Sequence, residues 1–188
     1  VNAPDVRADF EDMGHIFQST SDTEVLLHQI ARSRQESLTD AIAESLQAIT
    51  GAYCLVFLTP DALYIARDGF GFRPLCLGKI GEAWVVASET CALDLIGASY
   101  VRDIKPGELC RINVDGLESR MVTEKPRKAH CIFEFVYFAR PDSRIFGESC
   151  DKIRRKIGKQ LAKEHPAQAD VVVAVPDSSN TAALGYAK

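Results

Sequence analysis

The sequence has no long apolar run and no large excess of charge of either sign, and each absence excludes a class of protein. No apolar segment approaches the roughly 20 residues that a membrane-spanning helix needs. Residues 1–5 have neither the basic start nor the apolar core of a signal peptide. A formal net charge of −4, without a basic run, gives no reason to expect nucleic acid or a membrane as a partner. We therefore expect a cytoplasmic protein.

Cysteines are present but never close together in the sequence, which argues against a disulfide framework or a local zinc site. The four histidines do not have the spacing of a metal site or a catalytic dyad. No nucleophile with a partnered base can be identified, so the sequence assigns no catalytic residue. Most of the six cysteines are expected to be small buried hydrophobes. They are Cys54, Cys76, Cys91, Cys110, Cys131 and Cys150.

Three helix starts are predicted in the first hundred residues. Ser21 is expected to cap the first helix, with Glu24 three positions later completing a capping box. Ser37 is expected to cap a second helix, because apolar residues follow it at helical spacing. Ser88 is expected to cap a short helix that ends at Gly97.

Extended segments alternate with these helices up to about residue 128. Residues 52–66, 75–87 and 100–113 predict antiparallel hairpins, and a further hairpin turn is expected at residues 115–116. A glycine-punctuated loop at residues 67–74 separates the first two hairpins. The first part of the chain is therefore predicted to be helices packed on antiparallel sheet.

Residues 131–143 mark the boundary between two halves of the chain. The first part of this stretch is apolar or aromatic at nearly every position, which predicts a strand buried on both faces. Proline, aspartate and serine at positions 141–143 then end the strand in a turn. The sequence thus places one domain at residues 1–128 and the start of another at residues 129–188.

The second half has the strand and helix rhythm of an α/β domain. A helix is expected at residues 149–164, a central parallel strand at 171–175 and another helix from about Thr181. Between the last two, the hydroxyls of Ser178 and Ser179 precede a helix N-terminus, where phosphate or hydrated Mg²⁺ is often bound. The alternative is that both serines only cap the helix, since good caps use the same residue types.

Asp22 and Cys131 also have an ordinary structural interpretation. Asp22 lies in the first turn of its predicted helix, where a carboxylate complements the helix dipole. Cys131 begins an apolar stretch, in which a single cysteine is usually a core residue. Local pattern alone therefore favours a structural role for both residues.

Taken in order, these segments resemble the glutamine phosphoribosylpyrophosphate amidotransferases, or amidophosphoribosyltransferases. Any one of the matching motifs would be weak evidence, but the series is specific and extends along nearly the whole chain. The matching stretches are residues 17–24, 67–75, 86–89 with 92–94, 102–108, 131–143 and 173–179.

The resemblance implies an α+β glutaminase sandwich with αββα layers, incomplete here, followed by the start of an α/β phosphoribosyltransferase domain. Members of this family release ammonia from glutamine through a thioester on an N-terminal cysteine. They then transfer it to phosphoribosylpyrophosphate with magnesium, giving 5-phosphoribosylamine in the first step of purine biosynthesis. Feedback inhibition by purine nucleotides and a homo-oligomeric state are also implied.

Three residues correspond to functional positions of that family. Asp22 matches the acid that holds the amino group of glutamine, for which a carboxylate is a suitable charge-assisted acceptor. Ser178 matches a residue of the magnesium and phosphoribosylpyrophosphate site. Cys131 matches one cysteine ligand of the [4Fe-4S] cluster in the members that have a cluster.

The sequence also departs from the family pattern. The nucleophilic cysteine, the glutamine-binding arginine, the acidic ribose-binding loop and the other cluster cysteines are absent, and Gly69 stands where proline is common. We therefore expect an internal part of the enzyme that is inactive by itself. Two alternatives remain at this stage: another glutamine amidotransferase, or a non-catalytic regulatory protein that binds ligands with a phosphoribosyltransferase fold.

Overall fold

A computed structural model describes residues 1–188, and the chain forms two compact units that are described separately. The first unit contains residues 1–72 and 105–129, and the second contains residues 73–104 and 130–188. Each unit therefore combines two separate segments of the chain. Both units contain helices and antiparallel sheet, which makes the fold class α+β, as the sequence predicts for most of its length.

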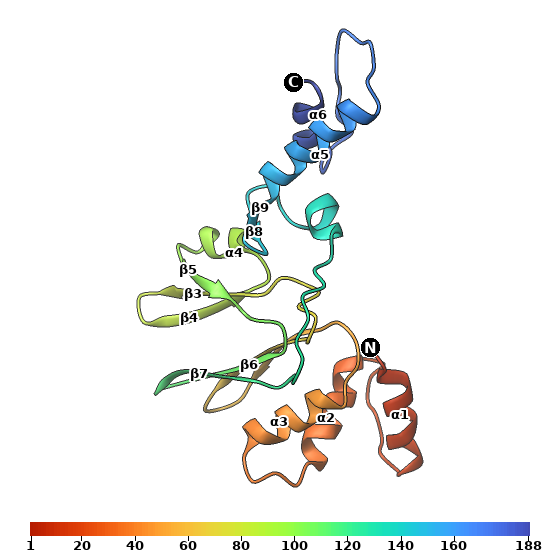
Figure 1. Cartoon of the computed structure of the whole chain (residues 1–188). Coiled ribbons are helices and arrows are strands. Elements are labelled where there is room, and N and C mark those ends of the chain that lie inside the picture. The colour runs from red at the N-terminus through yellow and green to blue at the C-terminus, as the bar shows by residue number, and fades with distance from the viewer. The chain divides into compact units, whose positions relative to one another are not determined.

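The first unit contains a four-stranded antiparallel sheet with the order β1-β2-β6-β7 (Figure 1). The hairpins predicted at residues 52–66 and around residues 115–116 are confirmed, and in the first of them Thr59 Oγ1 accepts a hydrogen bond from Ala62 N at 3.0 Å. The hairpin predicted at residues 100–113 is wrong, because its two strands belong to different sheets. The strands are β1 (Cys54–Leu58), β2 (Leu63–Arg67), β6 (Glu108–Asn113) and β7 (Gly116–Met121).

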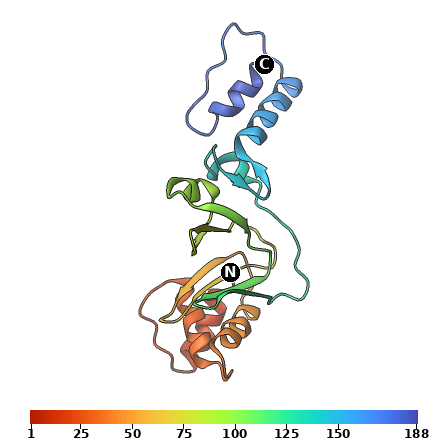
Figure 2. The ribbon, with the colours of Figure 1, turned by 90° about the vertical axis from the view of Figure 1, so that its left-hand side faces the viewer.

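Helices cover one face of this sheet (Figures 1 and 2). Their core contacts follow the apolar spacing of the sequence, since Leu26, Ile42 and Leu46 pack against Tyr64 and Leu109 of the sheet. Full burial of such side chains contributes roughly 1.5–3 kcal/mol each. The helices are α1 (Ala3–Asp12), which the sequence analysis missed, α2 (Asp22–Arg32) and α3 (Leu38–Gln47).

The caps of the two predicted helices differ in how closely they match expectation. Ser37 caps α3 as predicted, by accepting a hydrogen bond from Asp40 N at 3.1 Å. Ser21 caps α2, but it accepts from Thr23 N at 3.3 Å, and the predicted reciprocal capping box with Glu24 is not formed. The Glu24 carboxylate instead binds the backbone before the helix.

The second unit begins with a three-stranded antiparallel sheet, ordered β4-β3-β5, beside a short helix (Figure 1). Leu93 of that helix is fully buried against Cys76 and Ala98. The predicted cap at Ser88 is wrong, because the helix begins after Glu89 and has no side-chain cap. The elements are β3 (Cys76–Ile80), β4 (Ala83–Ala87), α4 (Thr90–Leu95) and β5 (Ser99–Asp103).

The strand predicted after residue 131 is wrong: a π-helical turn, η1 (Glu134–Phe138), occupies this position, and much of it is exposed. The Arg154 side chain donates hydrogen bonds to the carbonyls of Phe135 and Ala139, both at 2.7 Å. The Glu134 carboxylate also pairs with Arg73 at 2.6 Å. These distant partners stabilise the turn, and an apolar run alone does not distinguish a strand from a helix.

A two-residue hairpin and two helices complete the second unit. The helix predicted at residues 149–164 is confirmed with Ser149 as its cap, and the last helix begins one residue before the predicted Thr181. The helices touch through glycine, since a Cβ on Gly158 would lie 1.9 Å from the carbonyl oxygen of Ala182. No helix is both long enough and apolar enough to cross a membrane. The elements are β8 (Arg144–Ile145), β9 (Glu148–Ser149), α5 (Cys150–Glu164) and α6 (Asn180–Tyr186).

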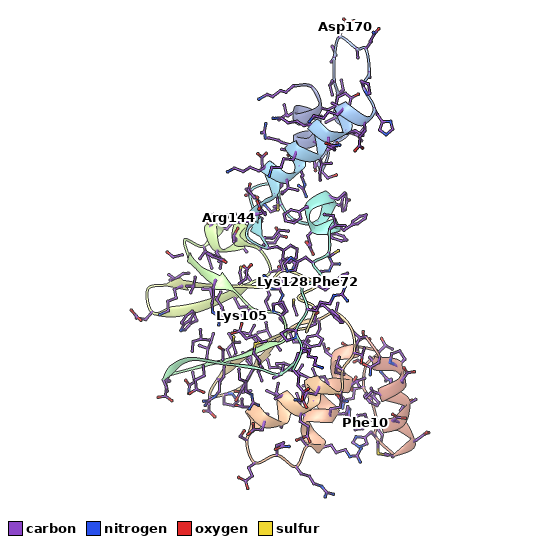
Figure 3. All side chains as sticks on the ribbon, in the orientation of Figure 1. Phe10, Phe72, Lys105, Lys128, Arg144 and Asp170 are labelled. Carbon is purple, nitrogen blue, oxygen red and sulfur yellow. The ribbon has the colours of Figure 1, made fainter.

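Residues 171–175 form no strand, which corrects the prediction of a central parallel strand. They belong to the loop between α5 and α6 on which Asp170 is labelled in Figure 3. Val173 is 82% exposed and Val175 is 81% exposed. A strand exists only where a neighbour completes its ladder of hydrogen bonds, and no other segment of the chain pairs with these valines. The predicted start of the phosphoribosyltransferase sheet is therefore not visible in this chain.

Candidate functional site

A cavity of about 180 Å³ lies in the first unit, where the N-terminal turn of α2 faces the start of β1. Most of its lining is apolar, and Asp22 supplies its only carboxylate. We call it the Asp22 cavity. Its lining residues are Val1, Asp22, Thr23, Leu26, Ile49, Ala52, Tyr53, Cys54 and Leu55.

The Asp22 carboxylate is free to bind a ligand. It is exposed and makes no hydrogen bond or ion pair within the protein, although it lies on the first residue of α2. The positive end of the helix dipole stabilises its negative charge. An unpaired carboxylate beside an apolar lining suits a ligand that has an ammonium group and a short aliphatic chain.

Tyr53 forms part of the wall of this cavity. Its backbone N–H donates to the Asp68 carboxylate at 3.3 Å, and its carbonyl accepts from Asp68 N at 3.0 Å. Burial, with a smaller contribution from the nearby Asp68 charge, raises the pKa of the Tyr53 hydroxyl to about 12. Tyr53 is therefore neutral at physiological pH and adds no charge that competes with Asp22.

The predicted loop at residues 67–74 is confirmed, and Asp68 organises it. The Asp68 carboxylate is completely buried and accepts hydrogen bonds from Phe70 N at 2.9 Å and Phe72 N at 3.3 Å; Phe72 is labelled in Figure 3. Gly71 has φ +57°, and a Cβ there would lie 2.7 Å from Pro106 Cγ. Only glycine fits this position without strain.

A larger hollow, of about 410 Å³, shares Ile49 and Tyr53 with the Asp22 cavity. It lies against the loop that contains Gly69 and against the segment that contains Glu124 and Lys125. These two opposite charges do not single out one kind of ligand. The Asp22 cavity, with one unpaired carboxylate, is therefore the better defined site.

Ser178 lies in the turn before α6 and is half-buried. The capping alternative for the two serines is wrong, because Ser179 is the residue at the N-cap position and its side chain makes no capping bond. The Ser179 hydroxyl instead donates to the carbonyl of Val175, and the Ser178 hydroxyl has no partner within the protein.

Cys131 is a free, half-buried thiol just before η1. No group of three histidine, cysteine or acidic side chains in the chain is placed to hold a metal ion. An iron-sulfur cluster needs four ligands, and a magnesium ion in a protein is usually held by one or two carboxylates. Cys131 alone therefore does not supply the four ligands of a cluster.

The structure places Asp22 in one unit and Cys131 and Ser178 in the other. Sequence reasoning identified Asp22 but missed Tyr53 and Cys54 in the wall of its cavity. The only available signal was that both begin a strand predicted to pack against the helix that follows Ser21.

Comparisons with known proteins identify the family of this chain. Residues 1–95 match the family model described as "Glutamine amidotransferase domain". The chain is 46% identical to the amidophosphoribosyltransferase of Bacillus subtilis (strain 168) over 188 residues, all of this chain and 40% of that protein. It is 50% identical to the chloroplastic amidophosphoribosyltransferase of Vigna aconitifolia, again along its whole length and over 39% of the relative.

Comparison with solved structures also gives relatives that match the whole chain. A structure of glutamine phosphoribosylpyrophosphate amidotransferase from B. subtilis, complexed with ADP and GMP, matches 99% of this chain and 41% of its own, with a TM-score of 0.97 and 46% identity. One described as the allosteric regulatory enzyme of purine biosynthesis matches 100% of this chain and 40% of its own, with a TM-score of 0.98 and 46% identity. The chain spans about two fifths of the length of these relatives. Because the family model covers half of it, the chain belongs to the glutamine amidotransferase domain family, and the relatives that match its whole length are amidophosphoribosyltransferases.

Proposed function

We propose that the full-length protein transfers ammonia from glutamine to phosphoribosylpyrophosphate, giving 5-phosphoribosylamine in the first step of purine biosynthesis. The observation that supports this most directly is the unpaired Asp22 carboxylate in an apolar cavity, in a chain whose whole length matches amidophosphoribosyltransferases. In this proposal residues 1–128 belong to the glutaminase domain, and residues 129–188 begin the phosphoribosyltransferase domain.

Asp22 is proposed to bind the α-ammonium group of glutamine. A carboxylate and an ammonium form a charge-assisted hydrogen bond, which is roughly twice as strong as a bond between neutral groups. The apolar lining from Leu26 and Leu55 suits the two methylene groups of the substrate. Asp22 thus orients the substrate. Cleavage of the glutamine side-chain amide is assigned to residues outside this chain.

Ser178 is proposed to contribute to the phosphoribosylpyrophosphate and magnesium site. Its unpaired hydroxyl and its position before α6 support this role.

Purine nucleotides are proposed as feedback inhibitors, since a related solved structure is complexed with ADP and GMP. A homo-oligomeric state and a cytoplasmic location also belong to this proposal, although several plant relatives are named as chloroplastic.

The test is an assay of the full-length protein with phosphoribosylpyrophosphate and Mg²⁺, with glutamine or ammonia as the nitrogen donor. We expect both donors to support pyrophosphate release, and EDTA to abolish it. Glutamine hydrolysis without any consumption of phosphoribosylpyrophosphate would instead indicate a different glutamine amidotransferase. Ligand binding without turnover of either substrate would indicate a non-catalytic regulatory protein.

Cys131 is proposed as the one ligand from this part of the chain to a [4Fe-4S] cluster in the full-length protein. Thiolates hold such clusters, so replacing Cys131 by serine is expected to remove iron and sulfide together. The measurement is iron and sulfide analysis of full-length protein purified without oxygen. Cys54→Ser, at another half-buried cysteine that forms no disulfide, is the control and should retain the cluster. An iron-free wild-type protein with full activity would rule the cluster out.

A further inference from the structure

Glu24 is an acidic residue whose carboxylate binds the segment before α2. Its side chain is only 16% exposed, and its Oε1 accepts a hydrogen bond from Gln18 N at 2.6 Å. Its Oε2 accepts from Ser19 N at 2.8 Å and from Ser19 Oγ at 2.5 Å. One carboxylate therefore fixes two consecutive residues of the segment that leads into Asp22.

Further hydrogen bonds continue from this carboxylate to both sides of Asp22. Ser19 Oγ, which donates to Glu24, also accepts from Ser21 N at 3.2 Å. Ser21 Oγ in turn accepts from Thr23 N at 3.3 Å, and the Ser21 carbonyl accepts from Glu24 N at 3.2 Å. The residues before and after Asp22 are thus fixed in place, whereas the Asp22 side chain is not bonded.

The environment of Glu24 keeps it charged. The hydrogen bond from the Gln18 backbone, followed by that from the Ser19 side chain, lowers the pKa of Glu24 below its usual value. His28 Nε2 lies 4.0 Å from Glu24 Oε1. Glu24 is therefore ionised at neutral pH, and a neutral glutamine at this position would lose the charge-assisted part of each bond.

We propose that Glu24 is a positioning residue for glutamine: it fixes the turn at residues 18–21 so that the Asp22 carboxylate points into its cavity. This rests on the proposed function, in which Asp22 binds the α-ammonium group. Glu24 does not line the cavity, so its effect on the substrate passes through Asp22. Without the charge of Glu24 the turn relaxes, and Asp22 spends less time in the orientation that binds.

The experiment compares Glu24→Gln with Glu11→Gln in the full-length protein. Glu11 is an exposed glutamate on α1 that pairs with Arg7 at 2.9 Å and has no contact with the turn. We expect Glu24→Gln to raise the KM for glutamine about tenfold, since charge-assisted hydrogen bonds are weakened but not deleted. The kcat at saturating glutamine and the ammonia-dependent rate should stay within about twofold of wild type, because the Asp22 carboxylate is retained. Glu11→Gln should change none of these values.

Two results would overturn the inference. A glutamine KM within twofold of wild type would show that the turn does not need Glu24. An equal loss with glutamine and with ammonia would show that Glu24 only supports the fold. Failure of the proposed function gives a different result, namely wild-type protein that does not use glutamine at all. Glu24→Asp keeps the charge but shortens the side chain, and it should lie between wild type and Glu24→Gln in KM.

Discussion

Replacing Asp22 by asparagine is expected to lower the glutamine-dependent kcat/KM of the full-length protein by roughly 30- to 4000-fold. This range corresponds to about 2–5 kcal/mol, the usual cost of leaving a buried charge without its partner, which here is the ammonium group once bound glutamine fills the cavity. Ammonia-dependent synthesis should remain close to wild type, because ammonia has no amino acid group to bind at this carboxylate. The measurement is the rate of pyrophosphate release with each nitrogen donor.

The separation between the two donors distinguishes a binding role from a structural one. Asp22 has no partner within the protein, so asparagine breaks no internal contact and should leave the unfolding temperature nearly unchanged. Asp5→Asn, at an exposed aspartate in the first turn of α1, is the matched control and should leave both activities intact. Equal losses with glutamine and ammonia would mean that Asp22 only stabilises its helix.

Local signals in the sequence predicted the helices that have strong caps. Ser37 forms the capping bond expected of it, since a cap depends on residues only two or three positions away. Three of the predicted antiparallel hairpins also form, because their turns and their apolar patterns lie within one short segment. The hairpin predicted at residues 100–113 does not form, since each of its strands pairs with strands from elsewhere in the chain.

Predictions failed where a distant partner determines the structure. The apolar stretch after Cys131 is a helical turn because Arg154 binds two of its carbonyls, and no local pattern contains that information. The valines at 171–175 have the composition of a buried strand, but a strand needs a neighbour, and none in this chain pairs with them. In both cases the composition indicated apolar segments correctly but not their conformation.

The candidate site shows the same limit. Local pattern favoured a structural role for Asp22, and only the resemblance to amidophosphoribosyltransferases indicated its function. The structure adds that its carboxylate is unpaired and lines a cavity. Glu24 was expected to bond back to Ser21, but it binds residues 18 and 19 instead, because the turn before the helix folds over it. Which N–H groups donate to Glu24 depends on the path of the backbone and could not be obtained from spacing.

Asp68→Ala is expected to have the largest effect on stability, because this buried carboxylate connects the residue before β1 to the loop at residues 67–74. It accepts backbone hydrogen bonds from Tyr53, Phe70 and Phe72, while the Asp68 carbonyl accepts from Gly107 N at 2.8 Å. Charge-assisted hydrogen bonds contribute up to about 1.5–3 kcal/mol each. Two of these three are long, at 3.3 Å, and such contributions are not additive, so removing the acceptor should cost roughly 3–5 kcal/mol. Tyr53 should shift with the loop, which would also weaken the use of glutamine.

The measurement is amide hydrogen exchange of the full-length protein, because it reports the opening free energy of β1 and β2 without requiring the other domain to unfold. We expect both strands to lose roughly 3–5 kcal/mol of protection in Asp68→Ala. Asp61→Ala, in the exposed turn between the same strands, should change protection by less than about 0.5 kcal/mol, as is usual for surface substitutions. If the two variants exchange alike, the buried carboxylate is not what connects the loop to the sheet, and the backbone bonds from Gly107 are sufficient for that purpose.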